Sequence, residues 1–375
     1  MLRRLFLLPV VLLAACASTP SKTANDAPAE LKDFAATAKF AVRWHENLGE
    51  AGSYLLRPAL LTDAIVGVSS KGVLTALSRS TGKPLWHVKT GLNVSGGVGA
   101  DDKMLLLGSD KGEVAAFDLS GKLLWQVKVS SEVLSAPQLV EGMVLVRSAD
   151  GRIAALNAAD GKPQWLYERA TPALAVRSFA GVTIQRGIVY AGFAAGKLAA
   201  LDLKTGSLLW ENSVSQPRGN TELDRISDIT SNVVVDDEQA CAIAFQGRVA
   251  CFDAAQGSPL WNRDIASDKG MMLLRKFLYL SDATGNVLAL EKSTGSSVWK
   301  NDALTLRDTN TPLALNDFVV VADFEGYLHA LARDDGHLVA RIKLDGSPLL
   351  GAPLELDNGL LVQTRDGGLY SLTLQ

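Results

Sequence analysis

Residues 196–210 read GKLAALDLKTGSLLW, and this stretch decides the fold because variants of it recur along the chain. Each copy opens on a glycine, continues through an apolar run, and passes a second glycine before a tryptophan position. The copies begin at Gly72, Gly112, Gly151, Gly196, Gly247, Gly285, Gly326 and Gly367, and the last is cut short at the C-terminus. A period of roughly forty residues is typical of the blades of a β-propeller.

Each repeat holds four short apolar runs that are separated by glycine-containing turns, which is the pattern of four antiparallel strands. In the third repeat the runs cover residues 136–140, 143–147, 153–156 and 163–166. We expect the turn glycines to adopt a positive φ, which other residues rarely take. The sequence therefore predicts an all-β chain that forms an eight-bladed β-propeller of four-stranded antiparallel blades.

Tryptophan recurs on the outermost strand of six repeats, and a lone four-stranded sheet could not bury so large a side chain. We expect these rings to pack between neighbouring blades. The seventh repeat has Ala340 at this position, so its junction requires other packing. The eighth repeat lacks an outer strand, and residues 36–47 (ATAKFAVRWHEN) offer one with Trp44. The N-terminal strand should therefore close the last blade and leave no open sheet edge at the seam.

The N-terminus carries an export signal. Residues 1–16 read MLRRLFLLPVVLLAAC, in which two arginines precede an apolar run and small residues, the layout of a secretory signal peptide. The final LAAC resembles the lipobox of bacterial lipoproteins, which implies cleavage before Cys16 and acylation of that cysteine. An ordinary signal peptide with a coincidental cysteine is the alternative.

The domain organisation follows from this assignment. Residues 1–15 are expected to be the lipoprotein signal peptide, residues 16–33 the lipidated cysteine and a flexible tether, and residues 34–375 the propeller. No aspartate follows Cys16, and by resemblance to enterobacterial sorting rules this favours the periplasmic face of the outer membrane. We expect the protein to contact the membrane only through this lipid. Several acyl chains are enough to anchor a protein stably.

Composition restricts the classes of function. With 47% hydrophobic and 21% charged residues the chain can bury a sizeable core. A formal net charge of −3 and the lack of a basic run argue against a nucleic-acid partner. Cys241 and Cys251 flank a hairpin centred on Gln246 and Gly247, so an oxidising periplasm would allow a disulfide between them. Two unlinked core thiols are the alternative.

Residues 200–210 (ALDLKTGSLLW) resemble the repeat of pyrroloquinoline-quinone (PQQ) type propellers. Together with the lipobox and the chain length, they make the sequence similar to the propeller lipoprotein family of the outer-membrane β-barrel assembly (Bam) machinery. The resemblance implies a non-catalytic scaffold that supports insertion of outer-membrane proteins. Its implied partners are the periplasmic repeat domains of BamA, other Bam subunits and unfolded outer-membrane proteins. A periplasmic PQQ-dependent quinoprotein or a small-ligand sensor that uses the central channel is the alternative.

No cofactor, metal site or catalytic residue is predicted. Quinone-dependent dehydrogenases of this repeat type commonly carry adjacent cysteines, and this chain has no such pair. Its four histidines show no ligand spacing, and no GxSxG nucleophile motif occurs. Aspartates such as Asp118, Asp202 and Asp253 fall at turns, where their carboxylates bond the backbone.

Two consecutive blade connections are enlarged. The next repeat glycine follows Trp165 after 31 residues and Trp210 after 37, against 24 to 27 elsewhere. Connections of this kind all emerge on the same face of a propeller. Residues 168–179 (the first long loop) and 211–230 (the second long loop) should therefore form one patch. Apolar side chains ringed by charges suit a protein contact, although long loops can also be tolerated insertions.

The family resemblance assigns residues to this patch. It implies a BamA contact made by a Leu-x-Leu-Arg segment on one loop and an acidic segment on the next. Leu174, Val176 and Arg177 match the first segment, and Asp228 matches the second. Thr230 stands where a second aspartate would be. Arg225 on the second long loop completes the expected partner-binding set.

Overall fold

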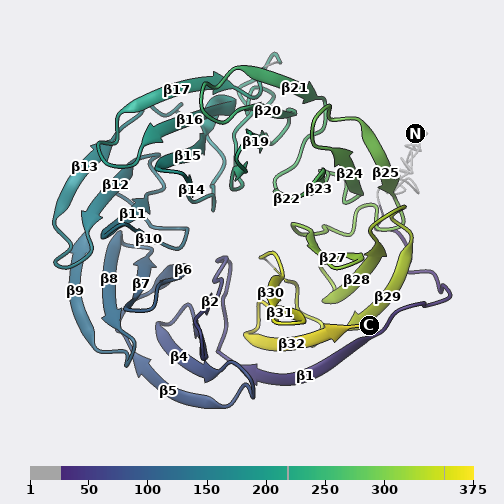
Figure 1. Ribbon diagram of the computed structural model, residues 1–375, viewed down its shortest axis with the longest axis horizontal. Helices are drawn as coiled ribbons and strands as arrows, with labels where there is room; N and C mark the ends of the chain where they lie inside the picture. Colours follow the sequence, from purple (N-terminus) through teal and green to yellow (C-terminus); the bar gives the residue numbers. More distant parts are fainter. Residues whose placement is uncertain (1–26, 218, 350) are drawn as a thin grey trace, which may run out of the picture.

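The computed structural model describes residues 27–217, 219–349 and 351–375, and in these ranges 32 strands form eight sheets around a central axis (Figure 1). All pairings within the sheets are antiparallel, and each sheet has four strands. The one helical element of the described ranges is the short 3-10 turn η1 (Ala194–Gly196). No helix there has the length and apolarity to cross a membrane. The predicted eight-bladed β-propeller is confirmed.

Seven blades are built from consecutive strands, which follow one another from the axis to the rim. Blade 1 has β2 (Ala59–Leu60), β3 (Ala64–Val68), β4 (Val73–Ser78) and β5 (Pro84–Lys89), and blade 2 has β6 (Val94–Ala100), β7 (Met104–Ser109), β8 (Glu113–Asp118) and β9 (Leu123–Lys128). Blade 3 has β10 (Gln138–Val140), β11 (Met143–Arg147), β12 (Ile153–Asn157) and β13 (Pro163–Tyr167), and blade 4 has β14 (Thr183–Gln185), β15 (Ile188–Phe193), β16 (Lys197–Asp202) and β17 (Leu208–Ser213).

The remaining blades follow the same plan until the last. Blade 5 has β18 (Val234–Val235), β19 (Gln239–Ile243), β20 (Val249–Asp253) and β21 (Pro259–Arg263), and blade 6 has β22 (Met271–Leu274), β23 (Phe277–Ser281), β24 (Val287–Glu291) and β25 (Ser297–Asn301). Blade 7 has β26 (Leu313–Leu315), β27 (Phe318–Ala322), β28 (Tyr327–Ala332) and β29 (Leu338–Lys343), and blade 8 has β30 (Leu354–Leu356), β31 (Gly359–Gln363), β32 (Gly368–Leu374) and β1 (Phe40–Asn47).

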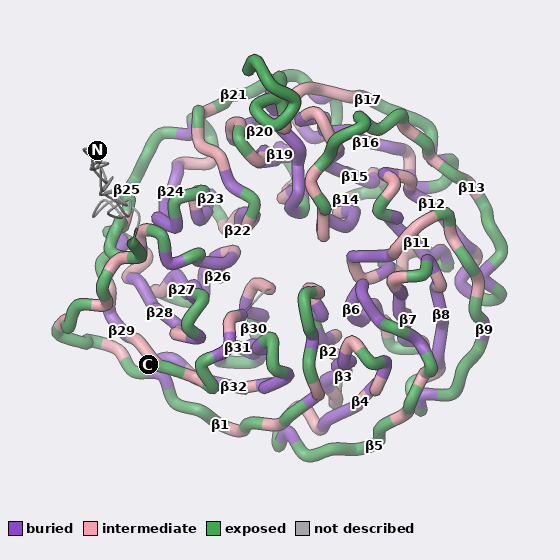
Figure 2. Tube along the Cα trace, turned by 180° about the vertical axis from the view of Figure 1, so that it is seen from behind, coloured by how far each residue is buried: buried purple, intermediate pink, exposed green. Residues whose placement is uncertain are grey.

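The core lies between the blades. The middle strands β11 and β19 are buried at every position, because a neighbouring blade covers each face of their sheets. The outermost strands, such as β5, show one face to solvent (Figure 2). Near-continuous apolar runs therefore mark the middle strands, and alternating runs mark the rim.

The N-terminal strand closes the ring, as predicted. Strand β1 pairs with β32 from Phe40 opposite Leu374 to Asn47 opposite Gly368. The backbone N–H of Lys39 donates to the carbonyl of Gln375 at 2.6 Å, so pairing extends to the end of the chain. The two termini of the propeller thus share one blade and leave no free edge at the seam.

The repeat tryptophan docks on a glycine of the next blade. Trp125 of blade 2 donates its Nε1–H to the carbonyl of Ala158 in blade 3 at 2.8 Å. Its ring lies over Gly161, where an added Cβ would come within 2.8 Å of the ring. The same contact recurs around the ring at Trp44/Gly82, Trp86/Gly121, Trp165/Gly206, Trp210/Gly257, Trp261/Gly295 and Trp299/Gly336. Two features require glycine at these positions: the tryptophan ring leaves no room for a Cβ, and the backbone has a positive φ.

The junction after blade 7 is packed by the N-terminal segment, which explains Ala340. The carbonyl of Val339 accepts hydrogen bonds from the backbone N–H groups of Thr37 and Ala38, each at 3.1 Å. Phe40 and Ala340 are buried in one core cluster. The incoming chain therefore occupies the side of blade 7 where a tryptophan would otherwise lie.

Contacts with the propeller begin before residue 34, inside the segment that we expected to be a tether. Ala29 donates its N–H to the carbonyl of Thr305 at 2.9 Å and accepts from Arg307 at 3.1 Å. Farther along, the carbonyl of Lys32 accepts from Arg341 at 3.1 Å. Residues 29–32 thus run along blades 6 and 7. The expected signal peptide (residues 1–15) and Cys16 lie outside the described residues.

The hairpin of β19 and β20 departs from the expected turn in one respect. Gly247 lacks the positive φ found at the other repeat glycines, and Gln246 adopts it instead, with a φ of 49°. Cys241 and Cys251 lie directly opposite each other, with their Cα atoms 4.1 Å apart. Their sulfurs are joined in a disulfide, which was one of the two alternatives left open by the sequence.

A double-mutant cycle tests the interblade contact. Trp125→Ala should lower the free energy of unfolding by about 3 kcal/mol or more, as for other buried aromatics. Gly161→Ala should also destabilise the protein for two reasons. The new Cβ would clash with the Trp125 ring, and alanine disfavours the positive φ of this position. The double variant should lose less than the sum, since the ring is then absent. Urea unfolding of the four proteins measures this, and strict additivity would show that the residues act independently.

Candidate functional site

The two long loops lie against each other where they lead into blades 4 and 5. The backbone N–H of Val176 donates to the Asp228 carboxylate at 2.7 Å, and that of Gly181 donates to the side-chain carbonyl of Asn232 at 2.7 Å. A further bond joins Thr183 to the carbonyl of Val233 at 2.6 Å. Residues 176–183 and 228–233 are therefore bonded side by side, so the loops form one continuous surface.

Asp228 is not the surface charge that the sequence suggested. It is only 4% exposed. One carboxylate oxygen accepts from the N–H of Val176, and the other accepts from the N–H of Ala195 at 2.8 Å. Ala195 has a φ of 57° within η1, the turn between β15 and β16. Two backbone donors satisfy the buried carboxylate, so Asp228 fixes the backbone of the first long loop from below.

Thr230 is buried as well, at the position where a second aspartate was expected. Its carbonyl accepts from the Ser178 hydroxyl at 3.4 Å, which is another bond between the two loops. The expected acidic half of the patch therefore lies beneath the surface. The sequence reasoning failed at this point because a loop carboxylate was taken to be solvated, and the backbone that it bonds comes from distant residues.

Leu174 and Arg177 are exposed on the first long loop, as are Glu168, residues 170–173 and Ala175. Leu174 is 44% exposed, Val176 is half-buried, and Arg177 is exposed. The Arg177 guanidinium lies over two rings, 5.4 Å from the centroid of Tyr54 and 5.7 Å from that of Phe179. Among the described residues it forms no ion pair. The rings thus orient a cation whose hydrogen-bond donors remain available.

The second long loop ends in a compact turn that projects from blade 5, visible as the exposed curl beside β20 in Figure 2. Thr221 and Asp224 bond each other reciprocally, with both N–H to side-chain distances at 3.1 Å. Arg225 donates to the carbonyl of Gly219 at 3.2 Å. The turn displays Leu223, which is 66% exposed. The second long loop thus also carries an exposed leucine.

A buried arginine beneath the first long loop was missed by the sequence reasoning. Arg147 ends β11, donates to the carbonyl of Gly181 at 3.2 Å, and lies 5.2 Å from the ring centroid of Phe193. Burial lowers the pKa of Arg147 to about 10, so the side chain still carries its charge at neutral pH. It ties the start of blade 4 to blade 3. An arginine at the end of an apolar strand gives no sequence signal of this role.

Outside the loops, a buried histidine and aspartate are hydrogen-bonded to each other, as in many catalytic sites. His329 Nε2 lies 3.0 Å from Asp323, while Arg341 Nε donates to His329 Nδ1 at 3.3 Å. Arg307 also bonds Asp323, at 2.7 Å. Burial lowers the pKa of His329 and holds the ring neutral, with its proton on Nε2. His329 has no exposed surface, so no substrate reaches it and the network is structural.

No group of three or more histidine, cysteine, aspartate or glutamate side chains arranged to hold a metal occurs in residues 27–217, 219–349 and 351–375. The repeat aspartates bond their own turns, as expected. Asp202, for example, accepts from the N–H of Thr205 at 2.8 Å. The loop surface is therefore the strongest candidate site, and its chemistry suits recognition.

Comparisons with known proteins agree on one family. A family model described as "Outer membrane protein assembly factor BamB" matches residues 70–301. The outer membrane protein assembly factor BamB of Nitrosomonas eutropha is 40% identical over 333 residues, which cover 88% of this chain and 81% of that protein. The crystal structure of BamB from Moraxella catarrhalis matches with a TM-score of 0.83 and 25% identity, covering 89% of this chain and 99% of that chain.

A likeness to an enzyme extends to the fold alone. A quinohemoprotein alcohol dehydrogenase from Comamonas testosteroni matches with a TM-score of 0.73 but only 14% identity, covering 89% of this chain and 76% of that chain. Architecture of this kind hosts unrelated functions, so it carries no argument for a shared reaction.

The role of Asp228 can be measured. Asp228→Ala leaves two buried N–H groups unbonded and should lower the free energy of unfolding by about 1–3 kcal/mol. Asp228→Asn retains one good acceptor and should lose less. Hydrogen exchange at Val176 and Ala195 should accelerate in both variants. The exposed Asp224→Ala is the control, and wild-type exchange at Val176 in Asp228→Ala would contradict the positioning role.

Proposed function

Because this chain belongs to the BamB family of outer membrane protein assembly factors, we propose that it is a non-catalytic scaffold subunit of the Bam machinery that binds BamA through its two long loops. The observation that carries the proposal is the bonded pair of loops itself. A protein contact needs a surface whose shape persists before binding. Asp228 and Asn232 supply that persistence by holding residues 176–183 in place.

The exposed side chains of this surface divide into anchors and steering charges. Leu174 offers an apolar group that a partner pocket would cover completely, as interface anchors require. Arg177 is already oriented by Tyr54 and Phe179, so it would lose little side-chain freedom on pairing with a partner carboxylate. Arg225 is exposed and its guanidinium lies 3.7 Å from Glu222, which suits a rim charge that steers association.

The wider setting belongs to the same proposal. As an assembly factor at the outer membrane, the protein would hold its propeller at the periplasmic face through an acylated Cys16 and contact other Bam subunits and unfolded outer-membrane proteins. The quinoprotein alternative is supported by fold similarity alone. The buried His329 and Asp323 offer it no accessible base.

The loop proposal predicts a separable defect. The double variant Leu174→Ala, Arg177→Ala should bind the periplasmic repeat domains of BamA about thirtyfold more weakly, which corresponds to about 2 kcal/mol. Its unfolding midpoint should stay near that of the wild type. The matched control is Leu85→Ala, Arg43→Ala, which removes an exposed leucine and an exposed arginine from the rim of blades 1 and 8. Titration calorimetry that gives wild-type affinity for the loop variant would move the contact elsewhere.

The anchor proposal is tested by Cys16→Ala. The variant should fold and retain BamA binding in solution, because the acyl chains and the propeller core are separate sources of free energy. It should be recovered in the soluble periplasmic fraction rather than with outer membranes. The fractionation uses cells in which the protein cannot contact BamA. If the variant still floats with outer-membrane vesicles in a sucrose gradient, another element provides the attachment.

A further inference from the structure

A small cavity lies between blades 3 and 4, beneath the end of the first long loop. It has a volume of ≈ 20 Å³, and one water molecule needs about 10–15 Å³, so the cavity accommodates a single species of that size. Its lining comes from three segments: Leu134 and Ser135 before β10, residues 147–149 at the end of β11, and Ser178 and Ala180 before β14. Ala149 is exposed, which gives the cavity access to solvent. Neither the family assignment nor the proposed BamA contact gives it a role.

Arg147 supplies the charged side chain of this cavity, and several contacts fix its guanidinium. The residue is only 9% exposed. Its two terminal nitrogens donate to the carbonyls of Gly181 at 3.2 Å and Gly192 at 2.5 Å, and the guanidinium lies over the ring of Phe193. A ligand would therefore meet a preformed cation, which reduces the entropic cost of binding.

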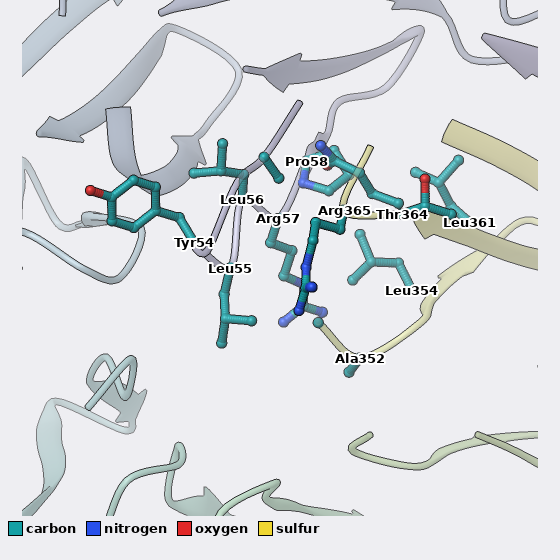
Figure 3. A pocket seen from close by; sticks show the side chains of 13 residues that line it. Tyr54, Leu55, Leu56, Arg57, Pro58, Ala352, Leu354, Leu361, Thr364 and Arg365 are labelled. Atoms are coloured by element: carbon teal, nitrogen blue, oxygen red, sulfur yellow. The ribbon is translucent and has the colours of Figure 1, made fainter. Parts of the chain in front are cut away.

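The arginines of another small cavity are not fixed in this way. Arg57 and Arg365 line the cavity between blade 8 and the segment before blade 1 (Figure 3), and both are exposed, with no side-chain hydrogen bond or ion pair to the described residues. Solvent therefore hydrates these two charges. Arg147 has lost most of that hydration, so its charge depends on what the protein and the cavity provide.

The charge of Arg147 has no carboxylate partner in the part of the chain that the structure describes. Its two acceptors are backbone carbonyls, which carry no net charge, whereas a buried cation is normally paired with an anion. Arg307, which is also buried, follows that rule and pairs with Asp323 at 2.7 Å. Arg169 lies over the same aromatic ring as Arg147, but it pairs with Glu211. Arg147 is therefore a fixed cation that lacks an anion.

The propeller itself does not require an arginine at this position. Arg147 lies opposite Ile153, two residues after the repeat glycine, and the strand register defines the equivalent position in every other blade. Those positions hold uncharged residues, which are Val68, Gly108, Gly192, Ile243, Ser281, Ala322 and Gln363. The buried charge is thus a feature of blade 3 alone and not of the repeat.

A serine hydroxyl adds a second donor to the lining. The Ser148 hydroxyl donates to a carboxylate and that of Ser178 to a backbone carbonyl, so both already have acceptors. The Ser135 hydroxyl has no acceptor among the described residues. A Cβ built at Gly181 would lie 3.3 Å from the Ser135 Oγ, which places this hydroxyl beside the residue whose carbonyl Arg147 bonds. Because a hydroxyl rotates to suit its partner, Ser135 can donate to a species in the cavity.

We propose that this cavity binds one monovalent anion of the size of chloride. The Arg147 guanidinium and the Ser135 hydroxyl are both donors, and an anion accepts charge-assisted bonds from them. A monatomic ion accepts hydrogen bonds from any direction, so it needs no planar arrangement of donors. A water molecule would fill the space but leave the charge of Arg147 without a counterion. Anion binding does not require BamA, so this proposal and the loop proposal fail or succeed separately.

Chloride binding in solution is measured from the line width of the chloride nuclear magnetic resonance signal, which broadens when the ion exchanges with a protein site. The mature full-length wild type should broaden this signal saturably, and added sodium bromide should reverse the broadening by competition. Sodium gluconate at the same ionic strength should not reverse it, because gluconate is too large for the cavity. No saturable broadening, or equal reversal by bromide and gluconate, would overturn the proposal.

Three variants locate the site. Arg147→Gln should abolish the saturable broadening, and Ser135→Ala should weaken chloride binding about tenfold, the loss expected for one hydrogen bond to a charged group. Arg43→Gln removes the same charge from the exposed rim strand β1 and should leave the affinity unchanged. Wild-type affinity in Arg147→Gln or in Ser135→Ala would contradict the proposal. The Ser135→Ala arm keeps it testable even if Arg147→Gln folds poorly.

A crystal of the mature full-length protein grown in sodium bromide tests the location directly. An anomalous bromide peak should lie in the cavity, within hydrogen-bond distance of the Arg147 guanidinium and the Ser135 hydroxyl. A species there without anomalous signal is a water molecule, and that result would overturn the proposal. A bromide peak without saturable broadening in solution would mark an adventitious ion only and would overturn it as well.

Discussion

The ring depends on one repeated contact, in which a tryptophan from the rim of one blade lies on a glycine of the next. The contact combines several requirements on the glycine and the tryptophan of each repeat. The indole packs its ring on the neighbouring blade, and the glycine allows both the close approach and a positive φ. In five of the seven pairs the indole N–H also donates to a carbonyl of the neighbouring blade. Each blade is thereby positioned against its neighbour rather than against the axis. A ring of eight results because this pairing repeats until the N-terminal strand completes the last blade.

Much of this architecture could be predicted from the sequence, because each repeat carries both halves of the contact: a glycine that receives the tryptophan of the preceding blade and a tryptophan that reaches the next blade. Gly206 and Trp210 lie four residues apart, and their spacing recurs with the blades. The closing strand was predictable for a similar reason, since Trp44 stands where the eighth repeat lacks its tryptophan. Gly247 was the exception. There the neighbouring Gln246 took the left-handed position, and no repeat pattern distinguishes these two arrangements of one turn.

The candidate site was harder to predict, because its organisation comes from polar groups that meet only in the folded chain. The loop lengths predicted that the two long loops lie side by side, and hydrogen bonds join them. The lengths could not reveal that Asp228 is buried, since its two donors belong to Val176 and Ala195 on other segments. Arg147 and the neutral His329 escaped notice for the same reason. Burial of a charge is a tertiary property, and a residue type in a loop or strand does not report it.

The pairing of β1 with β32 has a consequence for how the newly made chain folds. Its two strands come from opposite ends of the chain, so the first strand to be synthesised must wait for the last. Until then Trp44 and Phe40 stay without their partners, and blade 8 presents an open edge. Contacts so distant in sequence form late and slowly. Folding therefore includes an interval in which the propeller is an unclosed arc, and during that interval a holding factor could bind the open edge.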